Sequence, residues 1–201
     1  MIKLNIGCAS RPLNDYINID MDSIEDIKKR YPNLNISNNI KIYNYDIFNL
    51  PYKDLSVDEI RAEALIEHLS FHEESKFFFE IERVLKPGGK LYITTPDFDK
   101  IVEDWIKARD EWIDFHKSDD RSIKEEYWFG NNSYTRDNKW GYLTACIYGS
   151  QYGEGQYHKN CYTKNKLRLI ASKIHVDVVE MNTKKWKDER EYIIEFIGKK
   201  K

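Results

Sequence analysis

The sequence predicts an α/β fold built on a mostly parallel sheet. Short apolar strand patterns alternate with amphipathic helix patterns through the first hundred residues, which is typical of parallel strands joined by crossover helices. Small or acidic residues follow the expected strands, at Gly7, Asp20, Asp46, Glu63 and Asp97. Because ligands of open α/β sheets bind beyond the carboxyl ends of the strands, these positions predict a ligand site at one edge of the sheet.

Length and composition favour one domain spanning residues 1–201, with a formal net charge of -2 that offers no overall attraction to nucleic acid or membranes. No apolar run approaches the roughly 18 residues of a membrane-spanning helix. The first residues enter a strand pattern directly, without a basic and then apolar signal segment. The three cysteines lack metal-ligand spacing and are odd in number, so we expect a reduced, cytoplasmic protein without a metal site.

The first 22 residues contain the pattern on which the other predictions depend. Apolar residues at Ile2, Leu4 and Ile6 predict a strand, and small residues follow it in a turn over Gly7–Pro12. A second apolar strand then ends at Asp20. A strand that enters a loop of small residues gives backbone amides close access to a ligand, and an acid after the next strand can bind a ribose diol. This arrangement predicts a nucleotide-type site.

The later patterns predict further helices and strands. Helices are expected over Ser23–Tyr31, His72–Leu85 and Thr163–Ser172, and strands over Lys41–Asp46, Val57–Ala62, Lys90–Thr95, Ile174–Met181 and Glu191–Ile197. The last two strands follow one another through a basic turn, so we expect an antiparallel C-terminal strand. Between them and the first half, residues 98–162 begin as a helix and then become rich in Gly, Asn and aromatic residues. Such a long aromatic segment predicts a functional insertion on the substrate side.

Four segments together carry a resemblance to a known family. They are Leu4–Ser10, Tyr16–Asp22, Tyr45–Leu69 and Glu80–Asp97. The chain resembles the class I S-adenosylmethionine-dependent methyltransferases, specifically the small bacterial methyltransferase type 11-like proteins. The resemblance implies a Rossmann-like fold, S-adenosyl-L-methionine as cofactor and S-adenosyl-L-homocysteine as product. It also implies methyl transfer to an O or N atom of a small molecule, with a sugar or polysaccharide precursor as the acceptor class.

The chain departs from the family pattern in its first loop. The family's loop carries two or three glycines, whereas here Gly7 is followed by Cys8, Ala9 and Ser10. Twelve residues separate Gly7 from Asp20, and some of them form the second strand. A parallel crossover with its helix needs about a dozen residues or more. We therefore expect the first helix of the fold to be shortened or missing.

The resemblance assigns roles to individual residues. The cofactor-binding set it implies is Gly7, Cys8 and Ala9 in the loop, Asp20 at the ribose, Asp46 and Ile47 at the adenine, and Glu63 near the methionine end. Asp22 competes with Asp20 for the ribose. Arg11 could meet the cofactor carboxylate or be solvated.

Two histidines are candidates for a general base near neutral pH, His68 after the fourth strand and His158 in the aromatic segment. His68 also fits a structural helix start, and His158 also fits a surface turn. Tyr148, Gln151 and Lys159 are expected to bind the substrate, because a loop of this composition can close over a polar ligand.

Two rival functions remain open at this point. A nucleic-acid or protein methyltransferase would use the basic runs Lys184–Lys187 and Lys199–Lys201, although short runs of this kind are more often solvated. A non-catalytic protein that keeps the fold would bind a partner through residues 105–162. The sequence favours a small-molecule substrate, no membrane and no nucleic acid, and it leaves the oligomeric state open.

Overall fold

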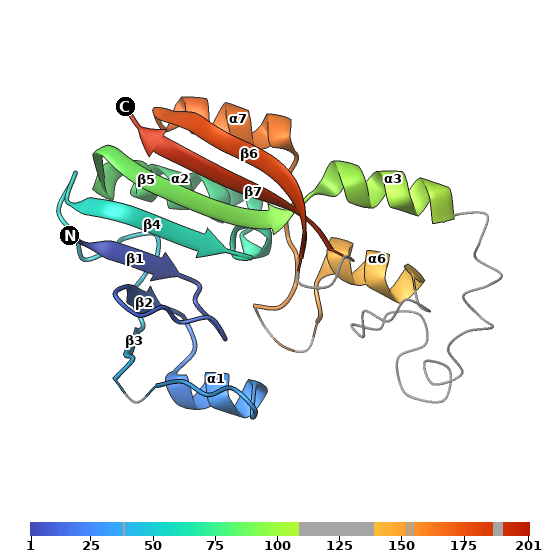
Figure 1. Ribbon diagram of the computed structural model, residues 1–201, viewed down its shortest axis with the longest axis horizontal. Coiled ribbons are helices and arrows are strands. Elements are labelled where there is room, and N and C mark those ends of the chain that lie inside the picture. The colour runs from blue at the N-terminus through green and yellow to red at the C-terminus, as the bar shows by residue number, and fades with distance from the viewer. Residues whose placement is uncertain (38, 109–138, 152, 154, 187–190) are drawn as a thin grey trace.

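The computed structural model describes residues 1–37, 39–108, 139–151, 153, 155–186 and 191–201. Its centre is one sheet of 7 strands in the order β3-β2-β1-β4-β5-β7-β6 (Figure 1). The strands are β1 (Lys3–Ile6), β2 (Ile17–Ile19), β3 (Ile42–Tyr43), β4 (Val57–Glu63), β5 (Leu85–Pro96), β6 (Val176–Trp186) and β7 (Glu191–Lys200). Strands β1 to β5 pair in parallel, and β7 pairs antiparallel to both β5 and β6. The predicted mostly parallel sheet with an antiparallel C-terminal strand is confirmed.

The helices are α1 (Ile24–Arg30), the 3₁₀ helix η1 (Ile66–His68), α2 (Phe71–Val84), α3 (Phe98–Ala108), α6 (Lys139–Tyr148) and α7 (Lys164–Lys173). In Figure 1, α2 and α7 lie behind the sheet, α3 and α6 lie beyond the carboxyl ends of its parallel strands, and α1 lies below β3. Three of these helices begin with side-chain caps, at the predicted Ser23 and Thr163 and at Ser70, one residue before α2, which was expected to begin at His72. None of the described helices is long and apolar enough to cross a membrane.

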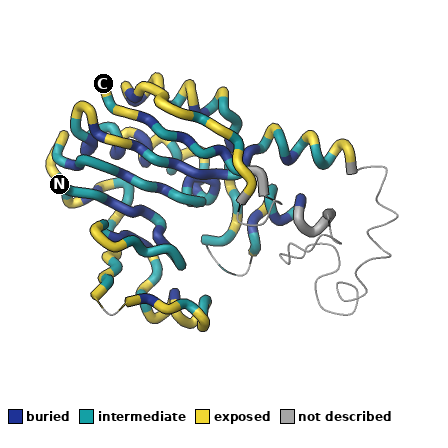
Figure 2. The backbone as a smooth tube through the Cα atoms, in the orientation of Figure 1, coloured by how far each residue is buried: buried dark blue, intermediate teal, exposed yellow. Residues whose placement is uncertain are grey.

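The core lies between the sheet and helices α2 and α7. Leu4, Ile60 and Leu91 stand next to one another in register on β1, β4 and β5, and all three are fully buried. They belong to one cluster with Phe77 and Ile81 of α2. Figure 2 shows dark blue, buried stretches alternating with less buried ones along the central strands. Side chains alternate between the two faces of a strand, so the next residue along each strand points away from this core.

The opposite face of the sheet carries polar side chains instead. Asn5, Arg61 and Tyr92 form the next row in register. The Arg61 guanidinium lies 3.9 Å from the centre of the Tyr92 ring, and the Tyr92 hydroxyl donates to Glu195 at 2.9 Å. The charged and aromatic groups on this face therefore interact with one another through cation–π contacts and hydrogen bonds. They do not form an apolar surface against which a helix could pack.

No helix joins β1 to β2, as the short spacing predicted. Two buried asparagines, Asn5 and Asn18, stabilise the connection between β1 and β2 in the absence of a helix. Asn18 accepts from the backbone N–H of Leu13 at 2.8 Å and donates to its carbonyl at 3.0 Å. Asn5 donates to the carbonyl of Arg11 at 3.0 Å and to Asn18 at 2.9 Å. Side-chain amides thus satisfy the backbone groups that helical hydrogen bonds would otherwise satisfy.

Several predicted elements have different bounds in the structure. The strand expected over Ile174–Met181 runs over Val176–Trp186, and the one expected over Glu191–Ile197 continues to Lys200. The third strand, expected over Lys41–Asp46, pairs only over Ile42–Tyr43, because the residues after it turn into a loop. The fifth strand, expected from Lys90, begins at Leu85 directly after α2. The intervening Lys-Pro-Gly-Gly stretch bulges out between two paired positions of β4 instead of ending the ordered structure. Within the predicted insertion, residues 109–138 lie outside the described part of the chain.

Candidate functional site

The loop after β1 approaches the strands around it closely. The backbone N–H groups of Gly7 and Cys8 donate to the carbonyl of Ile19 at 2.8 and 3.2 Å. Gly7 has φ +67°, and a Cβ atom there would lie 2.8 Å from Cδ1 of Leu65. Both the backbone conformation and the lack of space require glycine at this position. The loop therefore lies tightly over the carboxyl ends of β1 and β4.

Asp20 organises the same loop from the end of β2. Its Oδ2 accepts from the backbone N–H of Ala9 at 2.7 Å, and its Oδ1 accepts from Asp22 N–H at 3.0 Å. The side chain is buried, with 8% of its surface exposed. Each carboxylate oxygen keeps a second lone pair, so this acid can still accept hydrogen bonds from a bound hydroxyl. Asp22 instead pairs with Arg30 at 2.7 Å, which leaves Asp20 as the better candidate of the two.

Cys8 lies beside this carboxylate but is not a reactive thiol. Its side chain is buried, and burial together with the negative charge of Asp20 raises the pKa of the thiol to about 12. A thiol with this pKa stays protonated at neutral pH and is a poor nucleophile. Cys8 thus acts as a small, buried apolar side chain that packs within the loop.

The other predicted cofactor residues lie at the same edge. Asp46 is exposed after β3, and one of its oxygens accepts from Phe48 N–H at 2.9 Å, while Ile47 beside it is partly buried. Glu63 ends β4, where Arg61 lies 2.5 Å and Arg11 lies 3.7 Å from its carboxylate. The structure therefore brings the strand-end residues together at one edge. It also shows that Glu63 is already held by two arginines, which the sequence patterns did not indicate.

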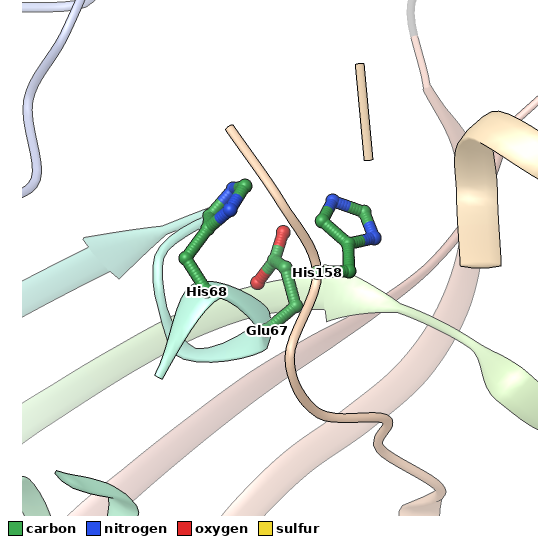
Figure 3. A group of neighbouring side chains, drawn as sticks. All are labelled: Glu67, His68 and His158. Carbon is green, nitrogen blue, oxygen red and sulfur yellow. The ribbon is translucent and has the colours of Figure 1, made fainter. Parts of the chain in front are cut away.

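A cluster of three side chains lies beyond the end of β4 (Figure 3). Glu67 and His68 come from η1, and His158 comes from the segment after α6. The two imidazole rings meet edge to face with centroids 4.8 Å apart. The structure thus unites the two histidines that the sequence named separately. It adds Glu67, which was missed although it directly precedes His68, because its burial depends on tertiary packing.

The electrostatic surroundings keep His158 neutral near pH 7. Burial lowers the pKa of its imidazole below the usual 6.5, and the neighbouring His68 acts in the same direction, against the opposing effect of Glu67. Glu67 itself is 2% exposed and accepts from the Thr95 hydroxyl at 3.1 Å. A neutral imidazole can accept a proton or bind a metal ion. The cluster therefore has the groups needed for proton transfer at a bound substrate.

The three predicted substrate residues lie near His158 in the sequence, but each has a different environment in the structure. Tyr148 is 55% exposed, and its carbonyl accepts from His158 N–H at 3.0 Å. Gln151 is exposed with φ +58° in the adjoining turn. Lys159 lies 3.9 Å from Glu73 at the start of α2, so its ammonium group points to that helix. Lys159 and Asn160 also donate their backbone N–H groups to the Glu67 carbonyl, which fixes this segment against η1.

Comparison with known proteins identifies the domain. Residues 6–93, which include the loop and the strand ends described above, match the family model of a methyltransferase domain. Over these residues the chain is similar to the methyltransferase-domain family, which supports a class I S-adenosylmethionine-dependent methyltransferase. The family resemblance read from the four sequence segments is thereby confirmed. The match ends within β5, so it covers the predicted cofactor residues and the β4–η1 junction but not His158.

Solved structures show the same fold across nearly the whole chain. A methyltransferase from Methanosarcina mazei is 19% identical with a TM-score of 0.61, covering 98% of this chain and 91% of that one. A Burkholderia thailandensis 1,6-didemethyltoxoflavin N1-methyltransferase, solved with its substrate and S-adenosylhomocysteine, is 10% identical with a TM-score of 0.59. It covers 99% of this chain and 70% of that one. At these identities the likeness establishes the fold.

Among curated sequences, a sterol 4-C-methyltransferase of Caenorhabditis elegans is 27% identical over 152 residues. That alignment covers 76% of this chain and 34% of the relative. The chain spans about a third of the length of the curated relatives it matches. The methyl acceptors named for these longer proteins therefore describe those proteins and not this chain.

Proposed function

We propose that this protein transfers the methyl group of S-adenosyl-L-methionine to an oxygen or nitrogen atom of a small molecule. One observation carries the proposal: the Gly7 loop, Asp20, Asp46 and the histidine cluster lie at the carboxyl edge of one methyltransferase-type sheet. The cofactor supplies an activated sulfonium methyl group, so the protein mainly has to position the two reactants.

The residues present fit that cofactor. Gly7 packs against Leu65 with no room for a side chain, which holds the loop close to the carboxyl edge of the sheet where the cofactor would bind. Asp20 would accept hydrogen bonds from the ribose hydroxyls, and Asp46 with Ile47 would meet the adenine. Arg11, partly buried near Glu63, is the candidate for the cofactor carboxylate. In this placement Glu63 orients Arg11 instead of touching the ligand itself.

The acceptor is proposed to lie next to His68 and His158. A hydroxyl acceptor must lose its proton, and these imidazoles are the nearest described groups able to take it. Tyr148 and Tyr157 are 55% and 46% exposed on the same segment. Exposed aromatic faces beside convergent polar groups suit a polar small molecule. Sugars or polysaccharide precursors are therefore the acceptors that we propose to test first.

The described basic residues favour a small molecule over nucleic acid. Lys184 pairs with Glu195, and Lys201 lies 3.3 Å from Asp177. Lysines bound to acids of their own chain attract phosphates less than an unpaired basic stripe does. Lys184 and Lys185 lie in β6, and Lys199 and Lys200 lie in β7, whereas Lys187 is outside the described residues.

Calorimetric binding of S-adenosylhomocysteine to the wild type, Asp20→Asn and Asp22→Asn tests the proposal. We expect micromolar binding by the wild type and a loss of at least about tenfold in Asp20→Asn, or about 1.4 kcal/mol. Asp22→Asn removes only an ion pair with Arg30 and should bind within about twofold of the wild type. Absence of binding by folded wild type would contradict the proposal and favour a non-catalytic protein that retains the fold.

A further inference from the structure

The cluster of Glu67, His68 and His158 has an arrangement that acid–base chemistry alone does not require. One potential ligand atom from each side chain lies within 4.8 Å of the others. Figure 3 shows the Glu67 carboxylate in the same cluster as the two imidazole rings, which contact each other edge to face. The three groups come from two segments far apart in the sequence, joined by backbone hydrogen bonds from Lys159 and Asn160 to the Glu67 carbonyl.

Both histidines are oriented by backbone carbonyls. Nδ1 of His68 lies 3.0 Å from the carbonyl oxygen of Tyr157, and Nδ1 of His158 lies 2.9 Å from that of Cys146. A carbonyl oxygen only accepts, so Nδ1 of each ring carries the proton. Nε2 of each ring then keeps its lone pair. Metal-binding histidines are fixed in this way, with the other ring nitrogen donating to a carbonyl or carboxylate.

Glu67 supplies the independent observation that points to a cation. Glu67 is 2% exposed, and its carboxylate accepts a hydrogen bond from a neutral hydroxyl, that of Thr95. Among the described residues no lysine or arginine forms an ion pair with it. A buried carboxylate without a positive partner is costly, and a bound cation removes that cost.

Resting on the proposed function, we propose that Glu67, His68 and His158 bind a divalent cation that holds the acceptor oxygen for methylation. Two imidazoles and one carboxylate are also the protein ligands of catalytic zinc sites that leave a position open. Zinc–nitrogen bonds of about 2.1 Å place tetrahedral ligands about 3.4 Å apart. Ligand atoms at the 4.8 Å limit must therefore move together by roughly 1.4 Å when the cation binds.

The open position gives the cation a role in the reaction. A metal-bound hydroxyl is a stronger acid and releases its proton to solvent. The resulting oxygen anion forms a bond to the methyl carbon while the carbon–sulfur bond breaks, and its electron pair passes to sulfur. With the cation bound, the histidines act as its ligands, and release of the proton to solvent replaces the direct proton transfer to an imidazole given above for the cation-free cluster. The favoured acceptor is accordingly a hydroxyl compound.

The test measures Zn²⁺ binding by calorimetry after the protein has been stripped with a chelator. Cys161→Ser serves as the background, because this thiol is exposed and could bind zinc on its own. We expect one Zn²⁺ per chain with micromolar or tighter affinity. Glu67→Gln and His158→Gln should each weaken it at least tenfold. His175→Gln is the matched control, since His175 is exposed and lies 2.6 Å from Glu82, away from the cluster.

Binding of S-adenosylhomocysteine is measured on the same samples and separates this inference from the proposed function. We expect it to be unchanged in Glu67→Gln and His158→Gln, which also shows that the variants fold. No stoichiometric Zn²⁺ binding, or binding that the two variants leave intact, would overturn the cation site while the cofactor site stands. Zinc binding without cofactor binding would instead contradict the methyltransferase role.

Discussion

Gly7→Ala is the substitution whose cost can best be worked out from the structure. At φ +67° an alanine pays roughly 1–2 kcal/mol for the left-handed backbone. Its Cβ would also lie 2.8 Å from Cδ1 and 3.2 Å from Cβ of Leu65, and such overpacking adds roughly 1–3 kcal/mol. We therefore expect the free energy of unfolding to fall by about 2–5 kcal/mol. The distorted loop should also bind S-adenosylhomocysteine at least about tenfold more weakly.

Gly88→Ala is the matched control. Gly88 has φ +76°, but a Cβ atom there would meet only Cε of Lys199 at an ordinary 3.6 Å. This variant should lose only the backbone term, about 1–2 kcal/mol, and keep its affinity for the cofactor product. Urea unfolding measures the first quantity and titration calorimetry the second. Equal destabilisation of the two variants, or full affinity in Gly7→Ala, would refute the close approach described for this loop.

Three further predictions concern other parts of the chain. Asn18→Leu leaves backbone groups of the β1–β2 connection unpaired and should cost about 2–4 kcal/mol in urea unfolding; a change below about 0.5 kcal/mol would contradict that role. Burial and Glu195 raise the pKa of Tyr92 to about 12, so its stabilising contribution is present below the ordinary tyrosine pKa of about 10 and is lost as pH rises toward 12. Tyr92→Phe should therefore lose less stability across that interval than the wild type, and equal losses would argue against this effect. In thiol labelling of the native protein, exposed Cys161 should react quickly and buried Cys8 should stay protected, whereas rapid labelling of Cys8 would show that the loop opens.

The sheet could be predicted from the sequence because its signals are local. Alternation of apolar residues marks each strand, and capping residues such as Ser23 and Thr163 mark the helix starts. The missing first helix also followed from the short spacing between Gly7 and Asp20. What replaces that helix did not follow, since the hydrogen bonds of Asn5 and Asn18 depend on how two strands align.

Part of the candidate site could also be predicted, because the ends of the strands can be read from local sequence patterns. The strand-end residues lie together because parallel strands end at the same edge, which sequence order reveals. Glu67 was missed because a glutamate next to a histidine carries no sequence signal of burial. The sequence also left Asp20 and Asp22 as alternatives, which the ion pair of Asp22 with Arg30 separates. Lys159 shows the reverse case, where a predicted substrate contact points toward Glu73 of α2.

The most direct test of the whole account is a crystal structure of the protein with S-adenosylhomocysteine. The account predicts the ribose hydroxyls on Asp20, the adenine beside Asp46 and Ile47, and the sulfur atom facing Glu67, His68 and His158. A ligand bound elsewhere, or one whose sulfur atom points away from the histidine cluster, would contradict it.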